Sequence, residues 1–401
     1  MADIIPFKGA RYNPEKIKAI SKVVAPPYDV ISEEEQSELY RRSQYNIVRM
    51  LLGKAMPGDN DKENKYTRAK NYLKAWQKNG VLKKDSEASI YINLQEFKLD
   101  GKQKRRIGFI ALLKLEEFDT KKSSIYPHEN TLSAPKEDRA KLIHAIEANL
   151  GPVFAIFEDR DRSISDILRK QMLSKPLVNI VDSRGIRNKF WQVCDKKIID
   201  ALCSSMKNKK IFIADGHHRY EVGLRFSKFK KDPKYGYILT YFTDLLGDGL
   251  VVLPYHRLIR IGREQACLFP TYLEKYFHIK NLKSKKDLKA FLGKAKPSEA
   301  RFVIYSQKHF TGLMFKDKKD MDVTIAKDLI IEPLKNFFID FTKDLDYAIK
   351  EVNKGKFSFA ILVNPVKITE IKDVAFLGRR MPQKSTYFYP KVLTGLVINV
   401  F

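Results

Sequence analysis

Ile211-Phe212-Ile213-Ala214-Asp215-Gly216-His217-His218-Arg219-Tyr220-Glu221 is the stretch around which this chain is organised. Its first three residues are apolar and predict a short buried strand. The Asp-Gly pair predicts a tight turn, because glycine adopts backbone angles that other residues avoid. From His217 onward, apolar residues recur among charged ones at a helical spacing. The stretch therefore predicts a strand, a turn and the start of a helix.

The predicted turn carries one carboxylate, two imidazole rings and a guanidinium, from Asp215, His217, His218 and Arg219. Backbone N–H groups at a helix start, such as those after Gly216, favour a bound anion. The alternative is that these polar residues only cap the helix. Because the chain has only seven histidines, two adjacent ones at this point favour a functional site.

The composition is that of a soluble globular protein of two or three domains, with 401 residues, 44% hydrophobic and 31% charged. No apolar run approaches the ~18 residues that span a bilayer. The N-terminus lacks the pattern of a signal peptide. Three cysteines without a CxxC pair are typical of free thiols in a reducing compartment, so we expect a cytoplasmic protein without a structural metal site.

The net charge of +27 first suggests nucleic acid as a partner. However, the lysines are spread along the whole chain in short clusters, which is typical of a solvated surface. A positive field would also attract a small phosphorylated substrate. We therefore expect small-molecule partners, no membrane partner and no specific nucleic-acid partner.

The first half of the chain alternates helical and strand patterns, beginning with the rigid Pro26-Pro27 segment that carries Tyr28 and Asp29. Ser32 and Glu35 form a capping-box signal for a helix that ends near Arg42. We expect helices over 63–80, 163–173 and 198–206, with another ending at Asn149, and strands over 46–52, 89–97, 107–115, 151–157, 187–193, 237–242 and 249–257.

Two polar pairs lie at the ends of these elements. His128-Glu129 follows Pro127 in a loop and is a candidate acid/base pair, a metal-ligand pair or an exposed loop edge. His256-Arg257 ends a predicted strand, where α/β enzymes usually place working side chains. Its alternative is a hydrogen-bonded structural pair.

Residues 262–345 predict a separate module in which helices over 267–277, 284–292 and 327–338 alternate with strands over 301–306 and 312–315. We expect a helix over 343–352, a strand over 357–363, a helix over 368–377 and a last strand over 396–401. The tail carries Lys384, Ser385 and Thr386 between Pro382 and Pro390; a cation beside two hydroxyls suits phosphate. The alternative is an edge strand with exposed lysines.

The pattern predicts a mixed α/β protein with a catalytic region over 1–261, an accessory α/β module over 262–345 and a C-terminal segment over 346–401 that returns to the active site.

Several motifs, taken together, resemble one family. They are APPYDVI at 25–31, HENT at 128–131 with Asp138-Arg139, ADGHHRYE at 214–221, LPYHR at 253–257 and MPQKSTYFYPK at 381–391. This is the cytoplasmic bacterial and archaeal family long catalogued as a domain of unknown function, members of which are identified as inorganic-pyrophosphate-dependent L-serine kinases. The DGHHR segment also resembles the ParB/sulfiredoxin-like free serine kinases, which implies a catalytic core of that fold.

The resemblance implies that the signature residues converge on one pocket. Carried over from the free serine kinases, Asp215 would be catalytic and His218 would contact phosphate. Those kinases also use a glutamate outside the motif, for which Glu129 is the candidate, with Glu221 and Asp29 as alternatives. The residues expected to bind phosphate are Gly216, His217, Arg219, His256, Arg257, Lys384, Ser385 and Thr386. Those expected to bind substrate are Tyr28, Asp29, His128, Thr131, Glu221 and Lys391.

The implied reaction is phosphoryl transfer from pyrophosphate to the hydroxyl of free L-serine, with Mg2+ bridging the pyrophosphate oxygens and with protein metal ligands left unassigned. The pyrophosphate would lie between the Lys384 loop and the Asp215 turn. A pyrophosphate donor would explain why the chain has neither a Walker A sequence nor a GxGxxG motif. The alternatives are an ATP- or ADP-dependent serine kinase of the same fold, and a ParB-like nucleic-acid-binding protein with a helix-turn-helix after the motif.

Overall fold

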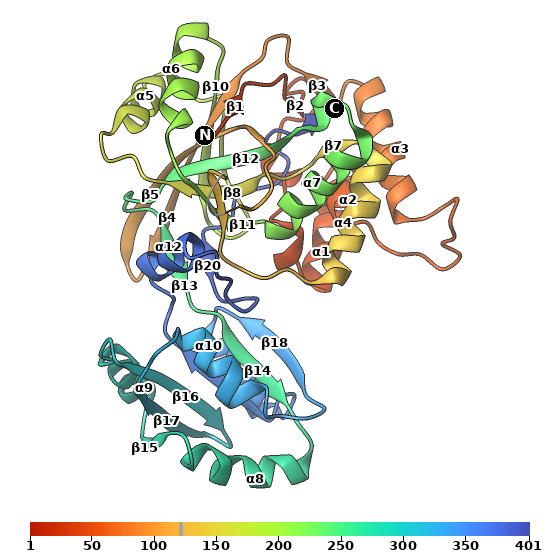
Figure 1. Cartoon of the computed structure of the whole chain (residues 1–401). Coiled ribbons are helices and arrows are strands. Elements are labelled where there is room, and N and C mark those ends of the chain that lie inside the picture. The colour runs from red at the N-terminus through yellow and green to blue at the C-terminus, as the bar shows by residue number, and fades with distance from the viewer. Residues whose placement is uncertain (120–122) are drawn as a thin grey trace. The chain divides into compact units, whose positions relative to one another are not determined.

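The computed structural model describes residues 1–119 and 123–401 (Figure 1). The chain forms two compact units. Unit 1 comprises Met1–Pro127, Thr131–Val251 and Pro390–Phe401, and unit 2 comprises His128–Asn130 and Val252–Tyr389. The unit boundary therefore runs through the HENT motif and again just before Pro390.

Unit 1 is built on a mixed sheet with the strand order β6-β11-β8-β12-β5-β4-β10-β9. Its strands are β6 (Ile125–Pro127), β11 (Ile211–Asp215), β8 (Val153–Phe157), β12 (Tyr237–Asp244), β5 (Lys102–Lys114), β4 (Ile90–Leu99), β10 (Arg187–Val193) and β9 (Val178–Val181), and β1 (Ile4–Ile5) also pairs with β5. β6 and β11 are parallel neighbours. Because parallel strands end at the same edge of a sheet, the chain leaves β6 and β11 on the same side.

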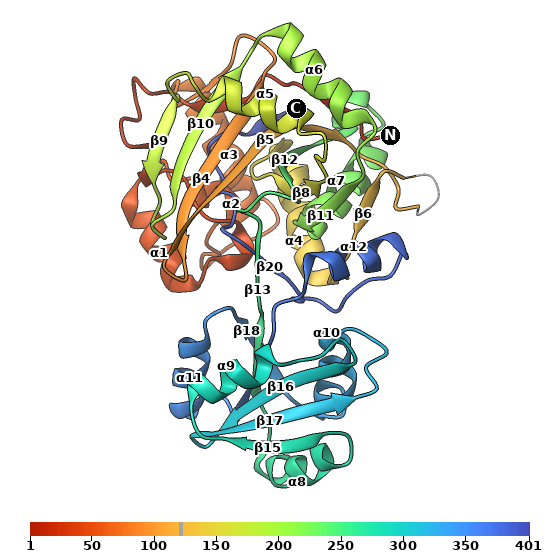
Figure 2. The ribbon, with the colours of Figure 1, turned by 90° about the vertical axis from the view of Figure 1, so that its left-hand side faces the viewer.

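Side-chain alternation divides the two faces of this sheet. One face packs α5 (Ser163–Gln171) and α6 (Lys196–Lys207) against alternate residues of the strands, such as Phe109, Ala111 and Leu113 of β5. In Figure 2 these two helices lie together beside β10 and β5. The alternate positions of β5, including Arg106 and Gly108, face the other side of the sheet.

A second core of unit 1 lies among its N-terminal helices, α1 (Glu33–Arg42), α2 (Val48–Leu51), α3 (Lys65–Lys78) and α4 (Ser133–Ile146), which Figure 1 shows grouped together. Trp76 of α3 is the aromatic centre of this core and contacts Tyr12, Tyr45 and Tyr72. α7 (His217–Lys230) packs against α4 through Val222 and Phe226, which cluster with Ile143. The short strands β2 (Ala10–Tyr12) and β3 (Leu82–Lys84) pair with each other, as do β7 (Ala148–Asn149) and β21 (Asn399–Val400).

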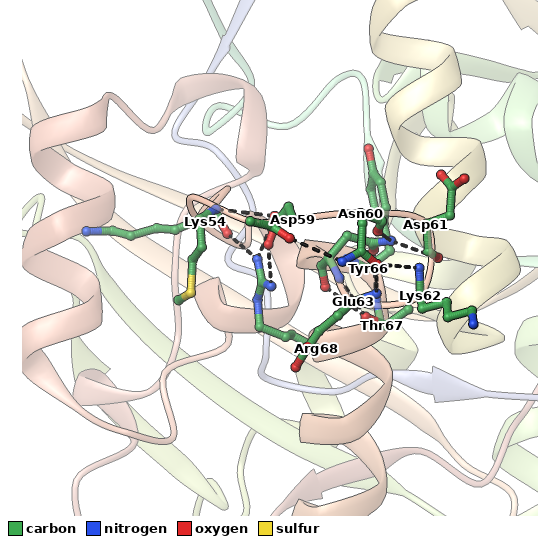
Figure 3. Close-up of polar contacts among 12 residues, drawn as sticks. Lys54, Asp59, Asn60, Asp61, Lys62, Glu63, Tyr66, Thr67 and Arg68 are labelled. Carbon is green, nitrogen blue, oxygen red and sulfur yellow. Dashed lines mark hydrogen bonds and ion pairs between the residues drawn. The ribbon is translucent and has the colours of Figure 1, made fainter.

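The start of α3 is stabilised by a reciprocal cap. The Asn64 side chain accepts hydrogen bonds from the Tyr66 and Thr67 N–H groups, and the Thr67 hydroxyl accepts from the Asn64 N–H. Arg68 ties the preceding loop to the helix through an ion pair with Asp59 (Figure 3). These bonds satisfy N–H groups that the helix itself leaves without partners.

Unit 2 is a sheet in the order β15-β17-β16-β19-β14-β18, sandwiched between helices. Its strands are β15 (His278–Leu282), β17 (His309–Lys316), β16 (Glu299–Ser306), β19 (Phe359–Val363), β14 (His256–Arg260) and β18 (Phe338–Thr342). One face packs α8 (Arg263–Glu274) and α10 (Asp322–Ala326), and the other packs α9 (Lys285–Gly293) and α11 (Leu345–Asn353). β19 contributes Phe359 and Ile361 to the first face and Ala360 and Leu362 to the second, so this central strand is covered on both sides. The remaining elements are α12 (Ile368–Phe376), β13 (Val251–Leu253) and β20 (Tyr387–Tyr389).

The predicted mixed α/β class is confirmed, while the ParB/sulfiredoxin-like assignment and the three predicted domain ranges stay predictions. Over 262–345 helix and strand alternate as expected, and β15 separates α8 from α9, so these consecutive described helices form no helix-turn-helix. β14 and β19, which flank that range, pair with each other in the same sheet. In the part of the chain that the structure describes, no helix is long and apolar enough to cross a membrane.

Several local predictions were wrong. Residues 46–52 contain the helix α2 (Val48–Leu51) and no strand, and its residues Val48, Met50 and Leu51 are all buried in the helical core. The helix predicted to end at Asn149 stops at Ile146, because Glu147 has a left-handed backbone and Ala148–Asn149 pairs with β21.

The other errors concern strand ends and one helix. The strand expected over 249–257 is divided into β13 and β14 around Pro254-Tyr255, where proline offers no N–H to a ladder. The helix expected over 327–338 ends at Ile331, in a π-helical turn (Lys327–Ile331) that continues α10. The last strand is confined to Asn399–Val400.

The cap of α3 makes the first testable prediction. Asn64→Ala should lower the free energy of unfolding by about 1 kcal/mol, because two N–H groups lose their acceptor. Urea unfolding followed by circular dichroism measures the change. Asn71→Ala, on an exposed position of the same helix, is the control and should not destabilise the protein. Equal stability of Asn64→Ala and wild type would contradict the assigned cap.

Candidate functional site

Asp215 is the last residue of β11, and the helix α7 begins two residues later. Gly216 between them has a φ of 87°, a left-handed backbone that glycine adopts without strain. It is the N-cap of α7, and no side chain caps that helix start. The predicted strand, turn and helix are therefore confirmed, and they place a carboxylate beside a helix N-terminus.

Two cations hold the Asp215 carboxylate, one on each oxygen. Arg219 Nη2 lies 3.2 Å from Oδ2 and Lys391 Nζ lies 3.0 Å from Oδ1. The side chain of Lys391 is only 4% exposed, and those of Arg219 and Asp215 are 14% and 18% exposed. Charge-assisted bonds at such partly buried positions are stronger than those on an open surface. In this structure Asp215 is thus an ion-pair partner of two residues that lie far from each other in sequence.

The guanidinium of Arg219 is itself fixed by the backbone around it. Arg219 Nη1 donates to the carbonyl of Pro152, at the start of β8. A Cβ at position 216 would lie 2.9 Å from Arg219 Nε, so a larger residue there would displace this guanidinium as well as strain the backbone. Gly151 lies beside the same guanidinium: a Cβ there would be 3.5 Å from Arg219 Nη1 and 2.8 Å from Thr394 Oγ1.

Tyr28 belongs to the same group of residues in unit 1. The guanidinium of Arg139 lies 4.1 Å from the centre of its ring. Burial and the nearby Asp29 raise the pKa of Tyr28 to about 12, and Arg139 and Arg219 oppose this shift. Tyr28, Arg139 and Arg219 line one small cavity of about 60 Å³ whose other walls are mostly apolar. Tyr28 is therefore a protonated hydroxyl close to the Asp215 ion pairs.

His218 and Glu221, on the first turns of α7, bind Leu132 and Thr131, at the end of the HENT motif. His218 Nε2 accepts a hydrogen bond from the N–H of Leu132 at 3.0 Å. Glu221 Oε2 accepts from the Thr131 hydroxyl at 2.8 Å and pairs with Lys136 at 3.1 Å. With Nε2 as an acceptor, the N–H that a neutral His218 could offer is on Nδ1.

In unit 2, the His128–Asn130 segment and the tail motif form one structure. The N–H of Met381 donates to the His128 carbonyl, and the N–H of Asn130 donates to the Met381 carbonyl. The buried His128 ring also contacts Thr386, with Nε2 and Oγ1 3.0 Å apart. Two motifs separated by some 250 residues are therefore joined by short hydrogen bonds.

Lys384 has a left-handed backbone, with a φ of 54°. A non-glycine residue in this conformation costs on the order of 1 kcal/mol and persists where the surroundings enforce it. Here Glu129 Oε1 accepts the Lys384 N–H at 3.1 Å, and the Ser385 hydroxyl donates to the Pro382 carbonyl. The Lys384 ammonium lies 5.5 Å from the centre of the Tyr255 ring. The loop thus presents Lys384 in a conformation that Glu129 and Ser385 maintain.

His256 and Arg257 are both buried at the start of β14. Burial, together with the charge of Arg257, lowers the pKa of His256 to about 4. His256 Nδ1 accepts the N–H of Val363, so the ring is a neutral structural acceptor. Burial also lowers the pKa of Arg257 to about 10, while Glu129 opposes the shift, and Arg257 Nη1 donates to the Tyr255 carbonyl.

The predicted site residues fall into two sets, one in each unit. Unit 1 holds Asp215 together with Tyr28, Asp29, Thr131, Gly216, His217, His218, Arg219, Glu221 and Lys391. Unit 2 holds Glu129 together with His128, His256, Arg257, Lys384, Ser385 and Thr386. Their convergence on one pocket stays a prediction.

Sequence reasoning missed three residues that support the Asp215 group. Arg139 stacks on Tyr28, and Arg106 and Gln95 hold the backbone beside Lys391. Arg139 stood in a motif quoted for the family but was assigned no role. Arg106 lies in the basic run 102–106, which resembles a solvated surface; only its alternation with Gly108 and Ile110 marks it as inward-facing.

No group of three or more His, Cys, Asp or Glu side chains among the described residues is placed to hold a metal ion. The three cysteines are unpaired thiols, as predicted.

The fold is that of an α/β protein. Its candidate anion site lies where β11 ends, at the two cations that pair with Asp215 and the N-terminus of α7. The chain belongs to the family described as "Protein of unknown function (DUF1015)", whose model matches residues 4–346. The family predicted from the five motifs is thereby confirmed. No curated protein sequence matches the chain.

Some solved structures resemble the chain at low identity. A conserved hypothetical protein from Pyrococcus furiosus is 10% identical with a TM-score of 0.40, covering 72% of this chain and 98% of its own. A free serine kinase in complex with AMP is 11% identical with a TM-score of 0.38, covering 68% and 89%. SbnI from Staphylococcus aureus, truncated at its C-terminus, is 9% identical with a TM-score of 0.43, covering 73% and 87%.

The buried His256 predicts a pH dependence of stability. Its pKa falls from 6.5 to about 4 on folding, so between these values protonation favours the unfolded chain. Its stabilising contribution is complete above pH 6.5 and is lost as the pH falls towards 4. Between pH 7 and pH 5 this residue should remove about 2 kcal/mol from the free energy of unfolding.

Urea unfolding at the two pH values measures this effect. His256→Asn keeps an acceptor for the Val363 N–H but does not titrate, so this variant should lose less stability than wild type on acidification. His309→Asn, at an exposed position of unit 2, should behave like wild type. The same loss in His256→Asn and wild type would show that His256 does not titrate in this way.

Proposed function

We propose that this protein transfers a phosphoryl group from inorganic pyrophosphate to the hydroxyl of free L-serine. The observation that carries the proposal is Asp215, held between Arg219 and Lys391 at the end of β11, with only Gly216 between it and the start of α7. Two cations against one carboxylate leave one net positive charge on this trio. A carboxylate orients a hydroxyl, and the surrounding cations and helix N–H groups suit phosphate oxygens.

In the proposed reaction the serine hydroxyl loses its proton and its oxygen forms a bond to one phosphorus of pyrophosphate. The bond from that phosphorus to the bridging oxygen breaks, and orthophosphate leaves with O-phospho-L-serine as the other product. Such a transfer depends on positioning and on charge stabilisation more than on covalent chemistry by the protein. Asp215 would orient the hydroxyl and accept its proton.

The other predicted residues are proposed to bind the two substrates. Arg219, the Nδ1–H of His218 and the N–H groups after Gly216 would contact phosphate oxygens, and Tyr28 would donate its hydroxyl to serine. From unit 2, Arg257, Lys384, Ser385 and Thr386 are proposed as phosphate ligands, and the neutral His256 would offer only an N–H. Glu129, which maintains the Lys384 backbone, is proposed to support this loop.

Magnesium is proposed to bind together with pyrophosphate, as a magnesium–pyrophosphate complex. Mg2+ is bound in proteins through few carboxylates and several phosphate or water oxygens. A magnesium–pyrophosphate complex therefore needs no protein cage. ATP or ADP as donors remain the alternative within the same activity, because an adenosine pocket can be built without a short motif.

The donor and the role of Asp215 are tested together. Purified protein with L-serine, magnesium and pyrophosphate should produce O-phosphoserine faster than with ADP or ATP, as measured by mass spectrometry. Asp215→Asn should lower turnover by about 10²–10⁴, the range typical for loss of a general base. Asp166→Asn, an exposed carboxylate of α5, is the control and should retain wild-type turnover.

Asp215→Asn also leaves the buried ammonium of Lys391 without this partner, so thermal unfolding must be recorded beside the kinetics. Assays below the melting temperature of the variant separate lost catalysis from lost folding. Near-wild-type phosphorylation by folded Asp215→Asn would rule out the proposed base. ATP as the preferred donor would replace pyrophosphate while keeping the serine kinase activity.

The tail loop makes a separate kinetic prediction. Lys384→Ala should raise the Michaelis constant for pyrophosphate by about tenfold or more, since a charged hydrogen bond to phosphate is lost, with little change for serine. Initial rates over both substrate concentrations measure the two constants. Lys354→Ala, which removes an exposed ammonium of unit 2, is the control. An unchanged pyrophosphate constant in Lys384→Ala would make the loop structural.

A further inference from the structure

Arg106 of β5 is almost completely buried, with 1% of its surface exposed. Its neighbour Arg105 points to the opposite side, where its side chain is 60% exposed and pairs with Glu96. Arginine is rarely buried so completely unless its guanidinium is paired. The burial of Arg106 therefore needs an explanation, whereas the exposed side chain of Arg105 does not.

A row of polar side chains crosses three strands at this level of the sheet. In the ladder registers, Asn188 of β10 is opposite Gln95 of β4, and Gln95 is opposite Arg106 of β5. Residues directly opposite each other in a sheet share a face. Arg106 Nε and Nη2 both donate to Gln95 Oε1, so the two side chains act as one hydrogen-bonded unit.

This pair holds two consecutive carbonyls of the C-terminal segment. Arg106 Nη2 donates to the Pro390 carbonyl, and Gln95 Nε2 donates to the Lys391 carbonyl at 3.1 Å. The side chain of Lys391 then reaches Asp215 Oδ1, three strands away from β5 in the sheet order. The backbone of Lys391 is thus fixed by β4 and β5, and its ammonium by β11.

The partners of Arg106 are neutral. Besides Gln95 and Pro390, its guanidinium lies over the rings of Phe154 and Tyr241, 4.6 and 5.6 Å from their centres. Burial lowers the pKa of the guanidinium, and the neutral Tyr241 hydroxyl opposes this shift. Such a group costs stability. A buried charge with neutral partners is better explained by the backbone that it fixes than by a gain in stability.

We propose that Arg106 is a positioning residue that acts through Lys391. By fixing the Pro390 and Lys391 backbone together with Gln95, it sets the place of the Lys391 ammonium and hence the orientation of the Asp215 carboxylate. The kinetic part of this proposal rests on the proposed serine kinase activity, whereas the structural part, the placement of Lys391, does not.

The structural part is tested by the reactivity of Lys391. Trace acetylation of the full-length folded protein with an amine-reactive ester, followed by peptide mass spectrometry, reports how accessible each lysine is. Arg106→Lys keeps the charge but replaces two donating nitrogens by one ammonium, so labelling of Lys391 should rise by about fivefold or more as its ion pair loosens. Arg105→Lys is the matched control on the same strand and should leave Lys391 protected.

Gln95→Met provides a second route if Arg106→Lys does not fold. It removes the donor to the Lys391 carbonyl and the acceptor for Arg106 without adding a charge, and it should also raise Lys391 labelling. Lys391 labelling that stays at the wild-type rate in the folded variants would overturn the proposal. This outcome is independent of any catalytic activity.

The kinetic part is tested by a double-mutant cycle. Arg106→Lys should lower kcat for O-phosphoserine formation by about 10–100-fold, because misplacement of a catalytic group by about 1 Å can cost a factor of 10², with smaller changes in both Michaelis constants. In a Lys391→Met background the same substitution should lower kcat by less than about twofold, since its effect passes through Lys391.

The two readouts separate the two proposals. Independent, multiplicative losses in the cycle would overturn the action through Lys391 and make Arg106 structural. Wild-type protein without serine phosphorylation from any donor would reject the proposed function, while increased labelling of Lys391 in Arg106→Lys would still confirm its positioning by Arg106.

Discussion

The ion pair between Asp215 and Lys391 joins the end of β11 to the C-terminal segment of the chain. Because the Lys391 side chain is almost completely buried, removing the carboxylate would leave an uncompensated charge inside the protein, which is far more costly than losing a surface pair. The segment from Pro390 onward is therefore tied to the candidate site by electrostatics as well as by packing. The buried Arg106 of β5 and Gln95 of β4 complete this arrangement by holding the backbone of the same segment.

The parallel pairing of β6 and β11 has a comparable effect on the loops. It brings the residues after Pro127 and those after Asp215 to one edge of the sheet, and α7 then binds the segment at Thr131 and Leu132 through Glu221 and His218. Side chains expected to contact substrate thus also hold the backbone. Such double use is common where a site is built on rigid elements, because the same hydrogen bonds fix the geometry that chemistry requires.

In unit 2 as well, a side chain of the candidate site holds the backbone, here that of a residue in a strained conformation. The left-handed backbone of Lys384 is maintained by Glu129, and Glu129 is held in turn by the pairing of its neighbours with Met381. Strain that persists under such constraints is found at ligand-binding loops more often than elsewhere. It is the structural reason for giving the tail motif a role in the proposed reaction.

Local signals in the sequence determined much of this protein. The strand–turn–helix at 211–221, the Ser32 cap, the helix over 65–78 and the alternation of the module at 262–345 follow from short-range patterns and were predicted correctly. The motifs also determined the family. Residues 46–52 were predicted wrongly because a short, mostly apolar run fits helix and strand equally well. Only the tertiary structure decided that Arg106 is inside the protein, that Lys391 pairs with Asp215 and that His256 is neutral. The physical reason is that burial and ion pairing depend on which distant segments meet, and local patterns in the sequence do not show those meetings.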